Sequence, residues 1–166
     1  EYLLGKTLLK GEDTEQDAER AEDLLRRSAD QGNRYAAYTL GKTLLDGDVL
    51  PQDIPEAIRL LKESADIGFS QAQYVLGKLL YRGALTEQDI PKALEYLEKA
   101  SAQKNPYAAY LAGKIRLTED AHRDIAKAIR HFEIAAEEGN DYAEYQLGKL
   151  YLYGKDIPQN YDKAIE

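Results

Sequence analysis

The segment Tyr145-Gln146-Leu147-Gly148-Lys149 is the clearest copy of a pattern, Tyr-x-Leu-Gly-Lys, that the sequence contains five times. The other copies begin at Tyr2, Tyr38, Tyr74 and Tyr110, the last with Ala112 in place of leucine. The glycines stand at positions 5, 41, 77, 113 and 148, so the steps are 36, 36, 36 and 35 residues. A fixed period of this length is typical of a solenoid, in which each unit buries its apolar face only against its neighbours. The pattern therefore predicts an elongated repeat array.

One unit, residues 33–68, contains the signals of two helices joined by a loop. Ala36, Leu40 and Leu44 are spaced three and four apart, which predicts the apolar stripe of a first helix that ends near Gly47. Asp53 then stands where a helix N-cap is expected, and Pro55 follows at a position where its missing amide hydrogen costs nothing. The unit is therefore predicted to be a helical hairpin.

The same helix start and end signals divide the whole chain into units. The predicted units are 1–32 (partial), 33–68, 69–104, 105–139 and 140–166 (partial), and the cap of each second helix falls at Asp17, Asp53, Asp89, Asp124 and Asn160. The chain begins at Glu1 and ends at Glu166, both partway into a unit. We therefore expect one array that is a fragment of a longer protein.

The fourth unit departs from the pattern, and one turn between units has a lysine in the place of a glycine. The fourth unit is one residue shorter, and its loop carries Glu119 near the place where other units have a glycine, so a tighter or differently shaped loop is expected. Lys104 stands at the end of a second helix where the other units have Gly32, Gly68 and Gly139.

The amino-acid sequence of the units resembles a known family of repeats. The segments Ala135–Asn140, Leu147–Tyr151 and Ile157–Tyr161, with Lys163-Ala164 after them, are similar to the Sel1-like repeat, and the likeness covers essentially the whole chain. A tetratricopeptide array has a stricter step of about 34 residues. The resemblance implies an all-α, right-handed α/α superhelical solenoid whose first helices line a concave surface, used mainly as a non-catalytic adaptor.

A narrower resemblance concerns plasmid mobilisation proteins. The segments Tyr107–Lys114 and Arg130–Ala136 look like the repeats that follow the nicking domain of some mobilisation relaxases of Gram-positive bacteria. None of the catalytic motif of a relaxase is present, so the resemblance does not imply nicking activity.

Composition narrows the function classes further. A net charge of −8 argues against a protein whose whole surface attracts nucleic acid. The sequence has no cysteine, which removes disulfides, thiolate nucleophiles and cysteine metal sites. No apolar run approaches the roughly 20 residues that cross a bilayer. We expect no membrane association and a cytoplasmic location, while the oligomeric state stays open.

The sequence contains no convincing catalytic group, and we predict a non-enzyme with no catalytic, cofactor-binding or metal-binding residues. His122 and His131 lack the helical spacing of a metal pair. Gly41-Lys42-Thr43 matches only the tail of a phosphate-binding loop, because Ala36 occupies the position of the earlier glycine.

The first helices carry the best candidates for a binding surface. At 100° per residue, Tyr38 and Lys42 fall opposite the stripe of Ala36, Leu40 and Leu44, so they are expected to face a groove. The predicted partner-binding residues on this concave face are Tyr38, Lys42, Tyr74, Lys78, Tyr81, Tyr107, Tyr110, Lys114, Tyr142, Tyr145 and Lys149. Packing between units is the competing interpretation of the tyrosines, and a plain solvated face is that of the lysines.

Two functional hypotheses follow from this surface. The favoured one is a protein-interaction scaffold that takes a peptide or protein segment, with acidic segments preferred, because tyrosine is enriched at interfaces and lysine attracts carboxylates. The alternative is an accessory module of a relaxase that contacts single-stranded DNA or the transfer machinery, by charge and base stacking.

Overall fold

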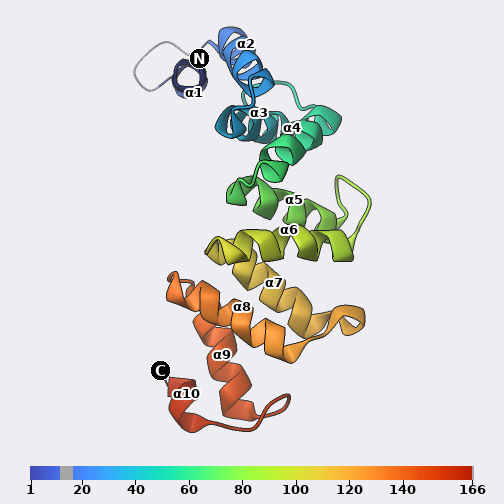
Figure 1. Cartoon of the computed structure of the whole chain (residues 1–166), viewed down its shortest axis with the longest axis vertical. Coiled ribbons are helices and arrows are strands. Elements are labelled where there is room, and N and C mark those ends of the chain that lie inside the picture. The colour runs from blue at the N-terminus through green and yellow to red at the C-terminus, as the bar shows by residue number, and fades with distance from the viewer. Residues whose placement is uncertain (12–16, 166) are drawn as a thin grey trace.

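The computed structural model describes residues 1–11 and 17–165, which form ten α-helices, one short 3-10 helix and no strand. The helices stack along one long axis with the termini at opposite ends (Figure 1). The prediction of an all-α solenoid is confirmed. The first, or A, helices are α1 (Tyr2–Lys10), α3 (Arg34–Asp46), α5 (Ser70–Arg82), α7 (Pro106–Thr118) and α9 (Asp141–Tyr153). The second, or B, helices are α2 (Ala18–Asp30), α4 (Ile54–Asp66), α6 (Ile90–Ala102), α8 (Ile125–Glu137) and α10 (Tyr161–Ile165).

The predicted caps start the B helices. The Asp53 carboxylate accepts a hydrogen bond from the Glu56 amide at 3.1 Å, which satisfies one of the amides that have no partner inside the helix. The same bond is made in the other units by Asp17, Asp89, Asp124 and Asn160.

Most A helices end at a glycine, followed by a loop glutamine that bonds back to the helix. The sequence predicted the glycine but not the role of the glutamine. Gly47 adopts a left-handed conformation with φ 75°, as expected of a C-terminal glycine. Gln52 then reaches back from the loop, and its Nε2 donates to the Leu45 carbonyl at 2.9 Å. A Cβ at Gly47 would lie 2.9 Å from the Cβ of Gln52, so the glutamine can fold back in this way only because residue 47 has no side chain. Gln88 and Gln159 make the corresponding bonds.

The fourth unit has neither the glycine nor the glutamine, and its loop differs as predicted. Glu119 ends α7 in an extended conformation, and a 3-10 turn, η1 (Asp120–His122), follows. A different bond holds this loop: the Arg116 guanidinium, on α7, donates to the His122 carbonyl in the loop at 3.3 Å. Lys104 takes a left-handed conformation with φ 61°, like the glycines at the corresponding place in other units.

The motif glycines allow the two helices of a unit to approach closely. Gly41 is buried, and a Cβ there would lie 3.1 Å from the Ala57 carbonyl oxygen of α4 and 3.2 Å from the Leu60 Cβ. Leu40, on the neighbouring side of α3, is fully buried. The prediction that leucine and glycine of the motif build the stack is confirmed for this unit.

Polar side chains tie successive units together. Gln73, on α5, is buried and donates to the Ala65 carbonyl of α4 at 3.1 Å, while its own oxygen accepts from Gln103, at the end of α6, at 2.9 Å. In the described part of the chain no buried side-chain nitrogen or oxygen lacks a hydrogen-bond partner. This chain of amides fixes the turn between α6 and α7 against α5.

The helices are short, each of them 13 residues or fewer. Across residues 1–11 and 17–165 no helix combines the length and the apolar character needed to cross a bilayer.

Candidate partner-binding groove

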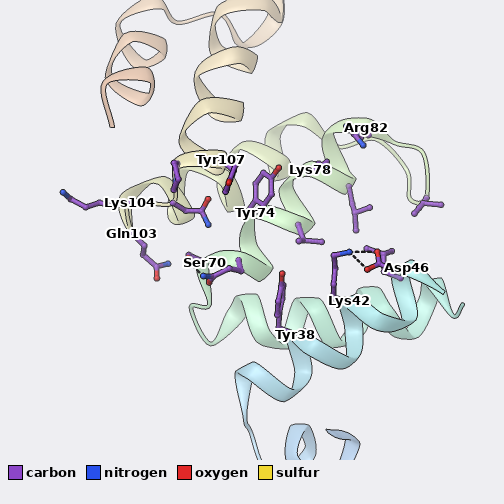
Figure 2. A pocket seen from close by; sticks show the side chains of 17 residues that line it. Tyr38, Lys42, Asp46, Ser70, Tyr74, Lys78, Arg82, Gln103, Lys104 and Tyr107 are labelled. Carbon is purple, nitrogen blue, oxygen red and sulfur yellow. Dashed lines mark hydrogen bonds and ion pairs between the residues drawn. The ribbon is translucent and has the colours of Figure 1, made fainter. Parts of the chain in front are cut away.

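A groove of about 780 Å³ lies along α3 and α5 and reaches the start of α7 (Figure 2). Its walls come from these helices, from Leu85 in the loop after α5, and from the turn between α6 and α7. The predicted partner-binding residues that line it are Tyr38, Lys42, Tyr74, Lys78 and Tyr107. The structure therefore brings together predicted residues from three consecutive units.

The tyrosines of the groove also contact the next unit. The rings of Tyr74 and Tyr107 lie 5.9 Å apart between centroids, and the ring of Tyr38 meets Phe69 edge-on at 5.1 Å. Tyr38 and Tyr74 are half-buried, whereas Tyr107 is 63% exposed. The same rings therefore join consecutive units and form a wall of the groove.

Burial sets the protonation of the half-buried phenols. Burial raises the pKa of Tyr38 and of Tyr74 above the usual value for a phenol, although Lys42 and Arg82 respectively act in the opposite direction. Both phenols are neutral at physiological pH because the raised pKa favours the protonated form. Their hydroxyl groups can therefore donate a hydrogen bond to a bound carbonyl or carboxylate.

The cations of the groove differ in what they contact. Lys42 forms an ion pair with Asp46, one turn later on α3 (Figure 2), and Lys104 pairs with Glu138 at 3.2 Å. The ammonium of Lys78 lies 5.8 Å from the centroid of the Tyr74 ring. Within residues 1–11 and 17–165 neither Lys78 nor Arg82 forms an ion pair. In the groove, Lys42 and Lys104 are therefore paired with carboxylates, whereas Lys78 and Arg82 are not.

Two of the predicted tyrosines are placed inside the stack of units. The Tyr81 hydroxyl donates to the Glu119 carboxylate at 2.9 Å, and its ring packs against the core formed by α6 and α7. Tyr110 lies 5.9 Å from Phe132 and 6.1 Å from Tyr142 between ring centroids. Neither Tyr81 nor Tyr110 lines the groove.

The remaining predicted residues lie elsewhere on the surface. Lys114 is exposed on α7, and Tyr142 and Tyr145 on α9 are 72% and 62% exposed. Lys149, whose ammonium lies 5.3 Å from the centre of the Tyr145 ring, lines a separate hollow of about 390 Å³. The tyrosine and lysine ladders therefore do not form one continuous groove.

Sequence reasoning left Arg82, Leu85 and Lys104 off the predicted surface. Arg82 is the last residue of α5, at the position that Asp46 occupies on α3 and Thr118 on α7. Comparing this position across units would have drawn attention to Arg82, because the motif lysine is followed one turn later by a second cation only there and at Lys10 of α1. Leu85 carries no such signal, since its position in the groove depends on how the loop folds back.

Neither histidine is part of the groove. His131 lies on α8 and contacts α6, where its Nδ1 is 2.9 Å from the Ser101 hydroxyl and its Nε2 is 3.8 Å from the Glu98 carboxylate. Burial lowers the pKa of His131, with nearby Glu98 acting in the opposite direction. Among residues 1–11 and 17–165, no group of three or more histidine, aspartate and glutamate side chains could hold a metal ion.

Solved structures share this architecture. The chain is 30% identical to a protective antigen of uropathogenic Escherichia coli that displays an SLR fold, with a TM-score of 0.89 over 99% of this chain and 37% of that one. It is 27% identical to a Sel1 repeat protein from Oxalobacter formigenes, with a TM-score of 0.84 over 96% of this chain and 46% of the other. An immunity protein from Pseudomonas aeruginosa, 22% identical with a TM-score of 0.56, shares the fold over 98% of this chain and 59% of its own.

The chain thus spans less than half the length of the first two of these proteins. No curated protein matches the sequence. The profile of the Sel1 repeat matches residues 1–33, 34–69, 70–105, 106–140 and 141–166, which is the whole chain. This chain therefore belongs to the Sel1 repeat family, whose members are generally non-catalytic scaffolds that bind protein partners.

Proposed function

We propose that this array binds an extended segment of a partner protein in the groove along α3 and α5. The observation that carries the proposal is the convergence of Tyr38, Tyr74 and Tyr107, from three consecutive A helices, on one groove. Tyrosine supplies a large contact area and a hydroxyl at a low cost in side-chain entropy, and it is enriched among the residues that dominate binding energy.

The size of the groove suits a few side chains of a peptide. Its volume of about 780 Å³ falls within the range of roughly 300–1,000 Å³ that is usual for ligand pockets. The amide chain from Gln103 through Gln73 to the Ala65 carbonyl holds its far wall against α5. A wall that is already in place reduces the ordering cost of binding.

Charge supports an acidic segment over a basic one. The protein carries a net charge of −8, yet the groove is lined by Lys42, Lys78, Arg82 and Lys104 against the single carboxylate of Asp46. A positive groove on a negative molecule attracts carboxylates and repels basic segments. We infer that the partner presents acidic residues to this surface.

The test is a comparison of two double variants in peptide binding. Peptides selected from a random display library on the wild-type chain are labelled with fluorescein, and their affinities are measured by fluorescence anisotropy. Lys78→Ala with Tyr107→Ser should weaken binding at least about tenfold, because both side chains line the groove and neither is fully buried. The matched control is Lys92→Ala with Tyr161→Ser, exposed residues of α6 and α10 outside the groove.

The result has two contrary outcomes. Equal affinities for the wild type and the groove variant would show that the groove does not bind the peptide.

The alternative hypothesis of a relaxase module stays a prediction, and a labelled thymidine oligonucleotide tests it in the same assay. Strong binding of that oligonucleotide, weakening steeply with salt, would favour single-stranded DNA over protein as the partner.

A further inference from the structure

We propose that Lys78 and Arg82 form a carboxylate-binding subsite that recognises an aspartate or glutamate of the bound segment. The inference rests on the proposed peptide-binding function and specifies where in the groove the charge of the partner is recognised. Three observations lead to it: the register of the A helices, the pairing of the other cations, and the apolar surface beside the two side chains.

The register of the repeat places different charges at equivalent positions. On α3 the motif lysine, Lys42, is followed one turn later by Asp46, and the two form an ion pair. On α5 the equivalent residues are Lys78 and Arg82. The unit on α3 therefore satisfies its own lysine, whereas the unit on α5 presents two positive charges at the same place.

The two cations on α5 lack the partners that the other groove cations have. Lys42 is neutralised by Asp46 and Lys104 by Glu138. Neither Lys78 nor Arg82 is paired with any carboxylate in the described part of the chain. Side chains four residues apart lie on the same helix face, and like charges there repel one another. A bound carboxylate would relieve this repulsion.

Apolar side chains beside the cations strengthen the expected contact. Leu45, Leu79 and Leu85 line the same groove, and Leu85 is 44% exposed. A segment that covered these leucines would exclude water from the neighbouring ion pair, which strengthens the attraction between the charges. The guanidinium of Arg82 can also donate two parallel hydrogen bonds to one carboxylate, an arrangement that a lysine cannot provide.

The occupant is therefore an acidic peptide segment that carries an aliphatic or aromatic residue next to its carboxylate. A phosphate chain would also meet the two cations, but the net charge of −8 repels a long polyanion over the rest of the surface. Binding of nucleic acid is an outcome of the test below.

The experiment exchanges the charge patterns of α3 and α5. Arg82→Asp gives α5 the lysine–aspartate pair of α3, and Asp46→Arg gives α3 the cation pair of α5. The probes are two fluorescein-labelled decapeptide pools, one built from Asp, Glu, Leu, Ile, Phe, Ser and Gly and the other with Asn and Gln in place of Asp and Glu. A labelled thymidine oligonucleotide is the third probe.

The acidic pool should bind the wild type at least about tenfold more tightly than the amide pool, and Arg82→Asp should abolish that preference. Arg82→Lys should keep most of it, and Asp46→Arg should increase it. Binding of both pools to the wild type with equal affinity, or an acidic preference that survives Arg82→Asp, would overturn the subsite. Preference for the oligonucleotide over the acidic pool would overturn it as well.

The failure of the subsite can be told apart from the failure of the groove itself. If peptides bind in the groove without regard to Arg82, the double variant Lys78→Ala with Tyr107→Ser still weakens them through the loss of Tyr107, and only the subsite is wrong. If neither pool binds the wild type at all, the peptide-binding function and the subsite are both wrong.

Discussion

Gly77 of α5 lies so close to Leu97 of α6 that a Cβ at the glycine would approach the Leu97 Cγ to 2.6 Å. Leu97 is fully buried, so it cannot move aside without disturbing its neighbours. Gly77→Ala should therefore lower the free energy of unfolding by about 1–2 kcal/mol, since overpacking costs more than the alanine gains in helix propensity. Urea unfolding followed by circular dichroism measures the change.

Gly148, the same motif position on α9, provides the matched control for that substitution. A Cβ there would meet only the Ala164 carbonyl oxygen at 3.4 Å, an ordinary contact. Gly148→Ala should raise the free energy of unfolding by about 0.5–1 kcal/mol, because alanine is the better helix former. If both substitutions destabilised the array equally, the close approach of α5 to α6 would not be the cause.

Lys104 adopts a strained backbone conformation that glycine adopts without strain in the other units. Its φ of 61° lies in the left-handed region, where Gly32, Gly68 and Gly139 stand in the corresponding turns. Lys104→Gly should stabilise the protein by about 1 kcal/mol, because the left-handed conformation costs a residue with a Cβ roughly 1–2 kcal/mol and the exposed ion pair with Glu138 contributes less. Thermal unfolding compares the variants, and Lys104→Ala, which keeps the Cβ, should not stabilise.

Acid should weaken the contact between the first two units through Glu56. Hydrogen bonds from Arg59 first, then from Arg26 of α2, lower the pKa of Glu56 to about 2, while its partial burial acts in the opposite direction. The folded state thus binds the proton less readily than the unfolded chain. The stabilisation is complete above about pH 4.5 and is lost as the pH falls toward 2.

Glu56→Gln should accordingly be less stable than the wild type by about 1 kcal/mol at pH 7, with the difference shrinking between pH 4.5 and 2. Urea unfolding of both proteins across this range measures it. Glu95→Gln removes an ion pair within a single helix, with Lys99, and serves as the comparison for an effect that does not join two units. A difference that stayed constant with pH would show that Glu56 acts without its charge.

His131 should give the array a second dependence on pH. Burial lowers the pKa of this imidazole, so protons bind the unfolded chain more readily than the folded one. The stabilisation is complete above about pH 6.5 and falls as the pH drops below that value. In a His122→Gln background, which leaves one histidine, the imidazole resonance in an NMR titration should report a midpoint below 6.5.

Replacing His131 should remove this second dependence. Leucine is the natural choice because Leu60 occupies the same place on α4, and Ser101→Ala in the same variant avoids leaving the buried Ser101 hydroxyl without its partner. The double variant should unfold at a midpoint that changes less between pH 7.5 and 5 than that of the wild type. An unchanged slope would assign the effect to other groups.

The local structure of each unit could be predicted from the sequence because the signals are contacts between near neighbours in the chain. Asp53 caps α4 through an amide three residues later, and Gly47 takes the left-handed conformation expected of a glycine at the end of a helix. Both depend only on backbone geometry that repeats with the period of the sequence. The loop after Glu119 was predicted to differ for the same reason, since it lacks the glycine that the others share.

The candidate site could be predicted only in part, because a helical projection gives the direction of a side chain and not its neighbours. Tyr38 and Tyr81 both point away from the stripe that packs within their own unit. Tyr38 lines the groove, but Tyr81 packs against the next unit and donates to Glu119, 38 residues away along the chain. Such a contact depends on how the units stack.

The sequence by itself determined the repeat, the helices and the residues that start and end them, because these follow from local chemistry written out once in every unit. Only the tertiary structure decided what each copy of Tyr-x-Leu-Gly-Lys does. The motif tyrosine Tyr74 lines the groove, whereas Tyr110 packs against Phe132 and Tyr142 and does not line it. The copies are almost identical in sequence, but their neighbours in the folded stack differ, and those neighbours decide which motif tyrosines reach the groove.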